Sequence, residues 1–294
     1  MRNTAAKNAL PAPPKPLDPF MRFVGGKRWL ASKLVPEILA SKARVYIEPF
    51  LGGGAIALSI PTIPIKILSD VNVVVMDVWR CLRAMPVPLN QALRELEDKY
   101  GNSEHGYYQA RARFNEMIRQ NRLMWCERAA HALFINARCF NGLWRTNSKG
   151  FFNVPWGDLT NPRQLSLEEI ESYSTYLRSG QTTLCDGDFH LTLARWREQD
   201  ARHIAVYADP PYDSMFDDYD GSGFSRDEQL SLAEELKFFA STGAQVWATN
   251  NDTPFIREIY KWAHIEEIDE RHAVSAKASS RGKKKCLLIR GRKP

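Results

Sequence analysis

An apolar run that ends in a rigid polar tetrapeptide constrains the fold more than any other stretch of this sequence. Residues 203–208 have the composition of a buried strand in a parallel sheet, and Asp209, Pro210, Pro211 and Tyr212 follow directly. In open α/β sheets, ligands bind beyond the carboxyl ends of the strands. We therefore expect the tetrapeptide to lie at the functional edge of such a sheet.

The tetrapeptide combines a carboxylate, a carbonyl group of fixed direction and an aromatic face. Because Pro211 fixes its own φ and pushes Pro210 toward an extended conformation, the Pro210 carbonyl and the Asp209 carboxylate should project the same way. The Tyr212 ring then presents a flat aromatic face beside them. Two acceptors beside a stacking face suit a planar ring with an amino group, such as a nucleobase. A stiff turn without function is the alternative for these residues alone.

The composition is typical of a globular protein, and the net charge favours a polyanionic partner. Of the 294 residues, 44% are hydrophobic and 25% are charged, and the net charge of +6 favours a polyanionic partner. The five cysteines form no Cys-x-x-Cys pair, so we expect no disulfide framework and no metal site. The sequence contains no apolar run of about 18 residues, so we expect no membrane span.

The first half of the sheet is expected to contain a ligand-binding unit. Residues 44–48 predict a strand, residues 49–54 a glycine turn, residues 55–60 the start of a helix, and residues 65–69 a second strand that ends at Asp70. Gly-x-Gly-x-x-Gly is absent, which argues against a pyrophosphate. Asp70 suits ribose hydroxyls or an amine, with a helix cap or a solvated turn as the alternative. A nucleoside without a pyrophosphate, such as S-adenosylmethionine, fits this pattern.

The middle of the chain predicts helices followed by an exposed loop. Leu89, Leu93 and Leu96 mark one amphipathic helix, and further helices are expected at 107–120 and 127–140. The following loop or hairpin at residues 141–150 combines basic groups with aromatic neighbours, which suits contact with DNA. A solvated hairpin packed on Phe and Trp side chains is the alternative.

The pattern returns to alternating strands and helices from about residue 180. A short strand ends near Leu184, and Ser225 with Glu228 predicts a capping box for a helix that runs to about residue 240. A strand at 244–249 and a helix opened by Thr253 and Pro254 follow. The segments at 264–269 and 286–289 could pair as a final antiparallel edge.

Five motifs together give the chain a resemblance to a known family. They are FVGGK at 23–27, EPFLGGG at 48–54, DVN at 70–72, the stretch from RCFNGLWR to NVP at 138–155, and DPPY at 209–212. In this order they resemble the Dam-type DNA adenine N6-methyltransferases (class alpha, D12 family), and the resemblance covers nearly everything from Phe20 onward.

The resemblance implies an α/β fold with a Rossmann-like, S-adenosylmethionine-dependent methyltransferase sheet and an inserted, mainly helical DNA-recognition domain. It divides the chain into a disordered Pro-rich arm at 1–19, a catalytic cofactor-binding domain at 20–80 and 180–294, and a target-recognition domain at 81–179. It also implies a monomer that binds double-stranded DNA in the cytoplasm of a bacterium or of a phage host.

The family's functional positions can be carried over residue by residue. The implied contacts to S-adenosylmethionine are Phe23, Lys27, Glu48, Pro49, Phe50, Gly52, Asp70, Asp188, Phe189 and Asp209. The residues implied to grip an adenine flipped from the duplex are Asp209, Pro210 and Tyr212. The implied DNA contacts are Arg22, Phe140, Asn141, Leu143, Arg145, Asn147 and Pro155.

These positions imply a site-specific enzyme that methylates N6 of an adenine in GATC or a related GA-containing site. Arg22 aligns with a basic residue that reads a guanine in relatives that target GATC, and Arg145 suits a bidentate guanine contact. The chain departs from the family at Asp158, where relatives often have a basic residue, and at Phe140, where some have tyrosine. These departures concern phosphate contacts and an intercalating wedge rather than the chemistry.

Three alternative functions share parts of this pattern. An rRNA adenine N6-methyltransferase would use the same tetrapeptide, but the long insertion that matches DNA-reading relatives argues against it. A catalytically inactive DNA-binding relative would not need the complete cofactor and catalytic motifs. A methyltransferase of glutamine in proteins usually has asparagine where this chain has Asp209.

Overall fold

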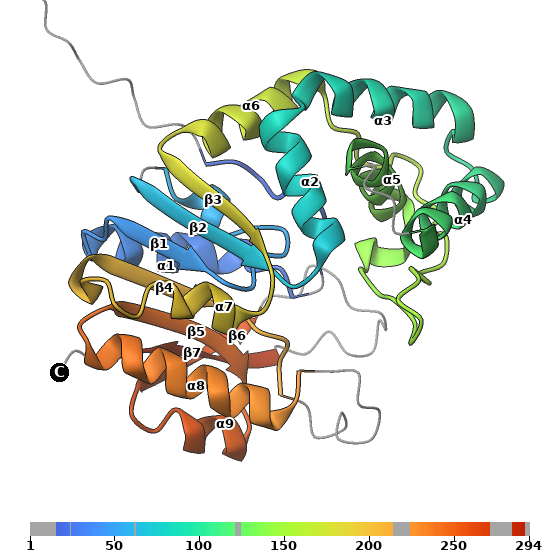
Figure 1. Cartoon of the computed structure of the whole chain (residues 1–294). Helices are drawn as coiled ribbons and strands as arrows, with labels where there is room; N and C mark the ends of the chain where they lie inside the picture. The colour runs from blue at the N-terminus through green and yellow to red at the C-terminus, as the bar shows by residue number, and fades with distance from the viewer. Residues whose placement is uncertain are drawn as a thin grey trace, which may run out of the picture.

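The core of the protein is a seven-stranded mixed sheet (Figure 1). The computed structural model describes residues 16–23, 25–61, 63–120, 125–213, 224–270 and 284–291. In spatial order the strands are β3 (Gln181–Asp186), β2 (Ile65–Asp70), β1 (Val45–Glu48), β4 (Ile204–Ala208), β5 (Gln245–Asn251), β7 (Lys284–Arg290) and β6 (His264–Glu270).

The strand order reverses between β1 and β4. These two strands pair in parallel at the centre, and the chain proceeds outward from β1 through β2 to β3 and from β4 to β5. Ligands bind where the strand order reverses in this way. The predicted antiparallel edge is confirmed, because β7 runs antiparallel to both β5 and β6.

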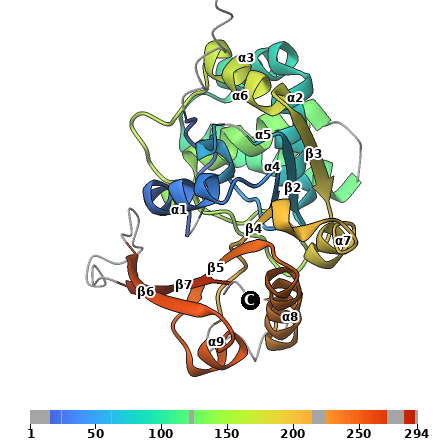
Figure 2. The ribbon, with the colours of Figure 1, turned by 90° about the vertical axis from the view of Figure 1, so that its left-hand side faces the viewer.

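Each face of the sheet has its own apolar core, because neighbouring side chains along a strand point to opposite faces. Tyr46 and Leu68 belong to the core on the side of α1 (Arg28–Ala40), whereas Ile47 and Ile67 pack toward the other face. Figure 2 shows α1 on one side of the sheet and α8 on the other. The helices that cover the face opposite α1 are α7 (Phe189–Ala194), α8 (Arg226–Ser241) and α9 (Pro254–Ile259).

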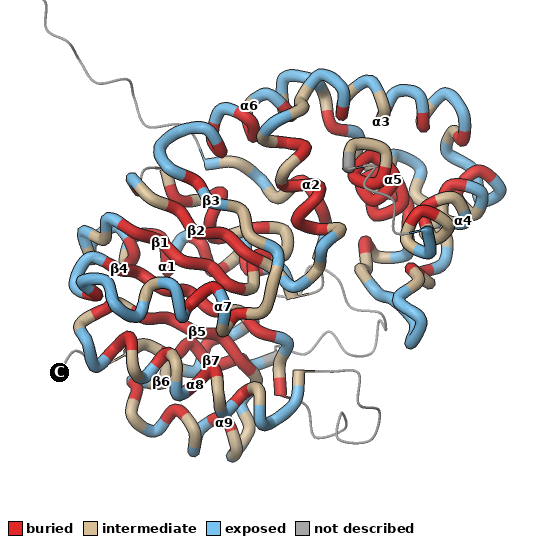
Figure 3. Tube along the Cα trace, viewed as in Figure 1, coloured by how far each residue is buried: buried red, intermediate tan, exposed pale blue. Residues whose placement is uncertain are grey.

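Among the described residues between β2 and β3, a segment here called the insertion, five helices lie together above and to the right of the sheet in Figure 1. They are α2 (Val73–Ala84), α3 (Pro86–Tyr100), α4 (Glu104–Gln120), α5 (Trp125–Arg138) and α6 (Leu167–Arg178). Helix α5 is largely buried, while α3 and α4 expose their outer faces (Figure 3). The expected helix marked by Leu89, Leu93 and Leu96 is confirmed as α3, with all three side chains buried. The expected domain boundary at residue 80 falls inside α2.

One local expectation differs from the structure. The helix expected from residue 55 is only the 3-10 turn η1 (Ala57–Ser59), because Ile60 precedes Pro61 and adopts an extended conformation. The expected arm at 1–19 lies mostly outside the described residues, which begin at residue 16. The Leu17 amide donates to the Leu58 carbonyl over 3.0 Å, which ties this residue to the turn η1.

None of the helices in the described part of the chain combines the length and the apolar character needed to cross a membrane.

Candidate active site

The tetrapeptide after β4 forms a clamp whose carboxylate is held from two sides. Asp209 Oδ1 accepts a hydrogen bond of 2.6 Å from Thr249 Oγ1 and lies 3.1 Å from Lys27 Nζ. Lys27 is 3% exposed, and its ammonium lies 4.7 Å from the centre of the Tyr212 ring. Burial and the neighbouring Asp209 raise the pKa of Tyr212, so this phenol stays neutral. The clamp thus presents a carboxylate and a neutral aromatic face to one cation.

The backbone after the clamp is fixed by hydrogen bonds from α8 and β5. Gln229 Nε2 donates to the Pro211 carbonyl over 2.8 Å, and the Asp213 amide donates to Asn250 Oδ1 over 2.9 Å. Thr249, Gln229 and Asn250 are not among the residues that the sequence motifs predicted for this site. The position of Thr249 and Asn250 at the end of an apolar strand is the one signal that could have pointed to them.

Asp70 at the end of β2 holds the glycine turn that follows β1. Its carboxylate accepts from the Gly52 and Asn72 amides, each over 2.8 Å. Trp79 Nε1 donates to the Gly52 carbonyl over 3.0 Å, and Gly52 has φ +47°. A Cβ on Gly54 (φ +63°) would lie 2.4 Å from the Trp79 ring, so the turn requires glycine at that position.

Glu48 at the end of β1 is a buried carboxyl group beside the clamp. It is 2% exposed and accepts a hydrogen bond of 2.7 Å from the Tyr46 hydroxyl. Burial, together with the charges of Asp209 and Asp70, raises the pKa of Glu48 to about 8. Burial also raises the pKa of Asp70. At neutral pH Glu48 is therefore protonated and can both donate and accept a hydrogen bond.

An aromatic cluster lies beside the ends of β1 and β3. The Phe50 and Phe189 rings stack with centres 5.5 Å apart, and Phe224 contacts both. Asp188 caps α7 through a bond of 2.8 Å from the His190 amide, which fixes the position of Phe189. Val71, directly after Asp70, is 72% exposed. The structure thus surrounds the glycine turn with carboxyl groups and apolar surfaces.

Three of the predicted DNA-contact residues, Arg145, Asn147 and Pro155, lie on a hairpin that projects beneath α4 and α5 (Figure 1). Thr146 bridges Phe152 across the hairpin, and the exposed Arg145 donates through Nε to Asn153 Oδ1 over 2.8 Å. Asn147 Oδ1 accepts from the amides of residues 149 and 151, so the oxygen of this side chain shapes the turn itself. Pro155 is exposed on the same segment.

The loop before the hairpin presents an aromatic side chain and contacts Arg22. Phe140 is 39% exposed, Asn141 has φ +55°, and Leu143 packs partly against the core. Arg22 is exposed, and a Cβ on Gly142 would lie 2.4 Å from the Arg22 Cβ. The fold therefore brings Arg22 next to the residues expected to contact DNA.

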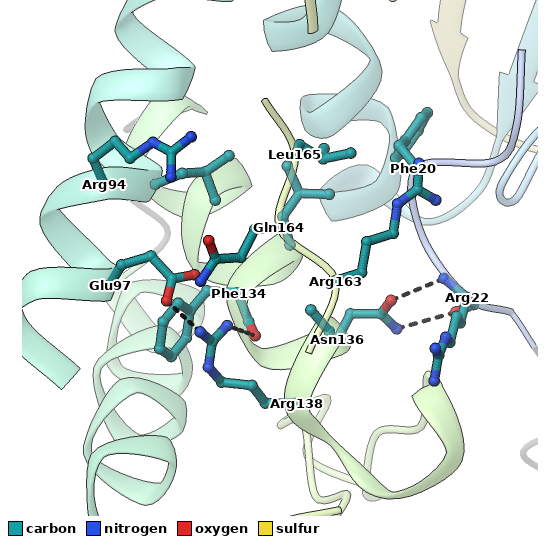
Figure 4. Close-up of a pocket in the computed structure, with 13 residues that line it drawn as sticks. Phe20, Arg22, Arg94, Glu97, Phe134, Asn136, Arg138, Arg163, Gln164 and Leu165 are labelled. Atoms are coloured by element: carbon teal, nitrogen blue, oxygen red, sulfur yellow. Dashed lines mark hydrogen bonds and ion pairs between the residues drawn. The ribbon is translucent and has the colours of Figure 1, made fainter. Parts of the chain in front are cut away.

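A small cavity of about 60 Å³ lies in the helical insertion, behind the Arg22 segment (Figure 4). Its lining includes Asn136 and Phe134 of α5 and Arg94 of α3, and none of the clamp residues contributes to it. The cavity is therefore separate from the clamp.

A Rossmann-like sheet with an Asp-Pro-Pro-Tyr clamp at the strand reversal defines the methyltransferase class of α/β fold. The family of this chain follows from its sequence. Residues 23–274 match the model of the D12 class N6 adenine-specific DNA methyltransferases, and the chain belongs to this family. The protein is thus an adenine-specific DNA methyltransferase, as the motifs predicted.

Curated relatives align over almost the whole chain. A type II methyltransferase of Lactococcus lactis is 33% identical, over 93% of this chain and 95% of the relative. A type II methyltransferase of Methanocaldococcus jannaschii is 29% identical, over 90% and 95% respectively. A DNA adenine methylase of Vibrio cholerae is 27% identical, over 92% and 94%.

Proposed function

We propose that the protein, as a monomer on double-stranded DNA, transfers a methyl group from S-adenosylmethionine to N6 of an adenine flipped out of the duplex. The proposed target is GATC or a closely related GA-containing site. A base inside a paired stack cannot be reached for this chemistry, so the adenine must leave the stack.

The position of Lys27 is the observation that supports this proposal most directly. Its ammonium bridges the Asp209 carboxylate and the Tyr212 ring, at 3.1 Å and 4.7 Å. A nitrogen-bearing group is thus accommodated at the place where an adenine would present its amino group while its ring stacks on Tyr212. We propose that the N6 amino group donates to the same Asp209 carboxylate when the base enters.

The residues beside the clamp suit S-adenosylmethionine. Glu48 and the glycine turn would hold its methionine end, Asp70 its ribose, and Phe50 with Phe189 would border its adenine. The buried carboxyl groups and the exposed apolar side chain of Val71 fit the amino, hydroxyl and aromatic groups of this ligand. When bound, the cofactor supplies an electrophilic methyl group on a sulfonium.

The clamp residues orient the amino nitrogen rather than react with it. The N6 lone pair is delocalised into the ring, and hydrogen bonds from the amino group to Asp209 and to the Pro210 carbonyl would favour its pyramidal form. Thr249 keeps the carboxylate in one orientation for this purpose. The amino proton leaves once the nitrogen carries positive charge, so Asp209 need not be a strong base. Orientation and fixed dipoles then account for the rate.

Recognition of the site is assigned to the exposed residues of two segments. Arg22 and Arg145 would each read a guanine through paired hydrogen bonds, while Leu143 and Pro155 would contact a thymine methyl. Phe140 is exposed enough to act as a wedge between bases. The basic groups of the hairpin would add contacts to phosphates.

The test is methyl transfer from labelled S-adenosylmethionine to duplex DNA, followed by analysis of the nucleosides. We expect N6-methyladenine, and treated plasmids should resist an enzyme that methylation of GATC blocks. Normal binding of the cofactor without any N6-methyladenine would defeat the proposal, and unimpaired cleavage would exclude GATC as the site.

The same assay separates the alternative functions. Transfer to ribosomal RNA in preference to duplex DNA would identify an rRNA methyltransferase, and transfer to a glutamine peptide would identify a protein methyltransferase. Binding to duplex DNA with no transfer to any of these substrates would identify an inactive DNA-binding relative.

A further inference from the structure

We propose that two asparagine side chains, Asn136 on α5 and Asn115 on α4, determine sequence specificity by fixing the backbones of the two base-reading segments. Neither side chain is assigned a contact with DNA. The inference rests on the proposed function, because it takes Arg22 and the hairpin around Arg145 as the readers of the DNA sequence.

Asn136 holds the Arg22 segment through both polar groups of its amide. The Arg22 N–H donates to Asn136 Oδ1 over 2.9 Å, and Asn136 Nδ2 donates to the Arg22 carbonyl over 3.0 Å (Figure 4). The same Nδ2 reaches the Gly142 carbonyl over 3.3 Å. One side chain, 2% exposed, therefore ties Arg22 to the start of the 140–155 loop and mimics a strand partner.

Asn115 holds the hairpin in the same way, from a different helix. The Phe152 N–H donates to Asn115 Oδ1 over 2.8 Å, and Asn115 Nδ2 donates to the Phe152 carbonyl over 3.0 Å. Tyr107 and Arg111, on the same face of α4, donate to the Val154 carbonyl over 2.7 and 2.8 Å. Three side chains spaced four residues apart thus fix the second strand of the hairpin.

The spacing of these groups explains why they fix one register. Four residues of helix rise about 6 Å, and two residues of strand span about 6.6 Å. Asn115 and Arg111 therefore match the backbone groups of Phe152 and Val154, and a slip of one residue would break every bond. A bidentate contact with a base requires a guanidinium at a defined place, so the register of the backbone decides which base pair is read.

The two asparagines hold different backbone segments, so their substitution should give a crossed pattern of effects. Asn136 contacts the Arg22 backbone and the Gly142 carbonyl, whereas Asn115 contacts only the hairpin strand paired with the strand of Arg145. Loss of the Asn136 contacts should impair discrimination at the base pair that Arg22 reads. Loss of the Asn115 contacts should impair discrimination at the base pairs that the hairpin reads.

The experiment uses the full-length enzyme with Asn136→Asp and Asn115→Asp. Both changes keep the side-chain shape and one acceptor oxygen, but they replace the Nδ2 donor by a second oxygen and add a negative charge. We measure kcat/KM for methylation of the preferred duplex and of every duplex with one base pair changed. The variants Arg22→Ala and Arg145→Ala identify the base pairs that each reader discriminates. The ratio between duplexes does not depend on the fraction of folded enzyme, so a loss of stability alone does not change it.

We expect Asn136→Asp to lower discrimination by about five- to a hundredfold at the pair that depends on Arg22, the range for one bidentate contact. Asn115→Asp should do the same at the pairs that depend on Arg145. Asn102→Asp is the matched control, because Asn102 Nδ2 also donates to loop carbonyls in this domain, at residues 159 and 160. It should leave all ratios unchanged.

Three outcomes would overturn the inference: unchanged ratios in both variants, equal losses at all base pairs, or an equal effect of Asn102→Asp. These outcomes are distinct from a failure of the proposed function. If the unsubstituted enzyme forms no N6-methyladenine, or if Arg22→Ala and Arg145→Ala leave the ratios unchanged, the proposed function or its assigned readers are wrong, and the inference falls with them.

Discussion

The clamp at the edge of the sheet and the DNA-facing hairpin hold their functional side chains in opposite ways. In the clamp, side chains fix one another, as Thr249 and Lys27 fix Asp209, and the groups are largely buried. In the hairpin, Arg145 stays exposed while the backbone opposite it is fixed from α4. Catalysis requires that the polar ends of the side chains are held in place. DNA recognition requires that the polar ends are exposed while the backbone beneath them is held in place.

The largest effect is expected when the Asp209 carboxylate of the clamp is removed. Asp209→Ala should lower kcat for methyl transfer by about 10³-fold, as the loss of a preorganised polar group does, and leave duplex binding largely intact. Asp209→Asn keeps one acceptor and should lose less. Steady-state kinetics and a DNA-binding titration measure both. Retention of near-normal kcat by Asp209→Ala would contradict the role of the clamp.

The close packing beneath the active site predicts the next largest effect. Gly54→Ala should lower the free energy of unfolding by about 3 kcal/mol, because its Cβ would lie 2.4 Å from Trp79 at a positive φ. Gly150→Ala is the matched control in the hairpin, with φ +77° and no atom within 4 Å of the added Cβ. It should cost about 1 kcal/mol for backbone strain alone. Urea titrations of both variants give the difference, and equal costs would exclude the clash.

Removal of the exposed Arg145 side chain is expected to lower sequence specificity rather than catalytic activity. Arg145→Ala should weaken the preference for the target sequence by about 1–3 kcal/mol, the value of one bidentate contact with a base. The kcat/KM ratio between the preferred duplex and its single-pair variants measures this. An equal loss of kcat on every duplex would instead place Arg145 in the catalytic machinery.

A pH-dependent effect concerns the buried proton of Glu48. The folded protein keeps this proton up to about pH 8, whereas an exposed glutamate loses it near 4.5. Between these values the folded state binds one more proton, so Glu48 makes stability fall as pH rises, by up to about 1.4 kcal/mol per pH unit. Glu48→Gln should remove this slope in urea titrations at pH 6 and pH 8. An unchanged difference between the two pH values would show that Glu48 is ionised in the folded state.

Much of the fold could be predicted because it depends on local patterns. The apolar runs of β1, β2, β4 and β5 mark strands, and the Ser225 capping box marks the start of α8. The helix expected at residue 55 failed, because Pro61 prevents the helix from continuing past Ile60. The contact of Asn147 with DNA stays a prediction. The two hydrogen bonds that its side-chain oxygen accepts within the turn could not be predicted, because they depend on the geometry of the folded hairpin.

The sequence by itself determined the strand pattern, the family and the composition of the clamp, since Asp209 to Tyr212 are neighbours along the chain. Only the tertiary structure decided which distant residues support them. It brings Thr249 to Asp209 across 40 residues and Asn136 to Arg22 across 114. The reason is physical: a local pattern sets which face of an element is buried, but contacts between distant side chains depend on how whole elements pack.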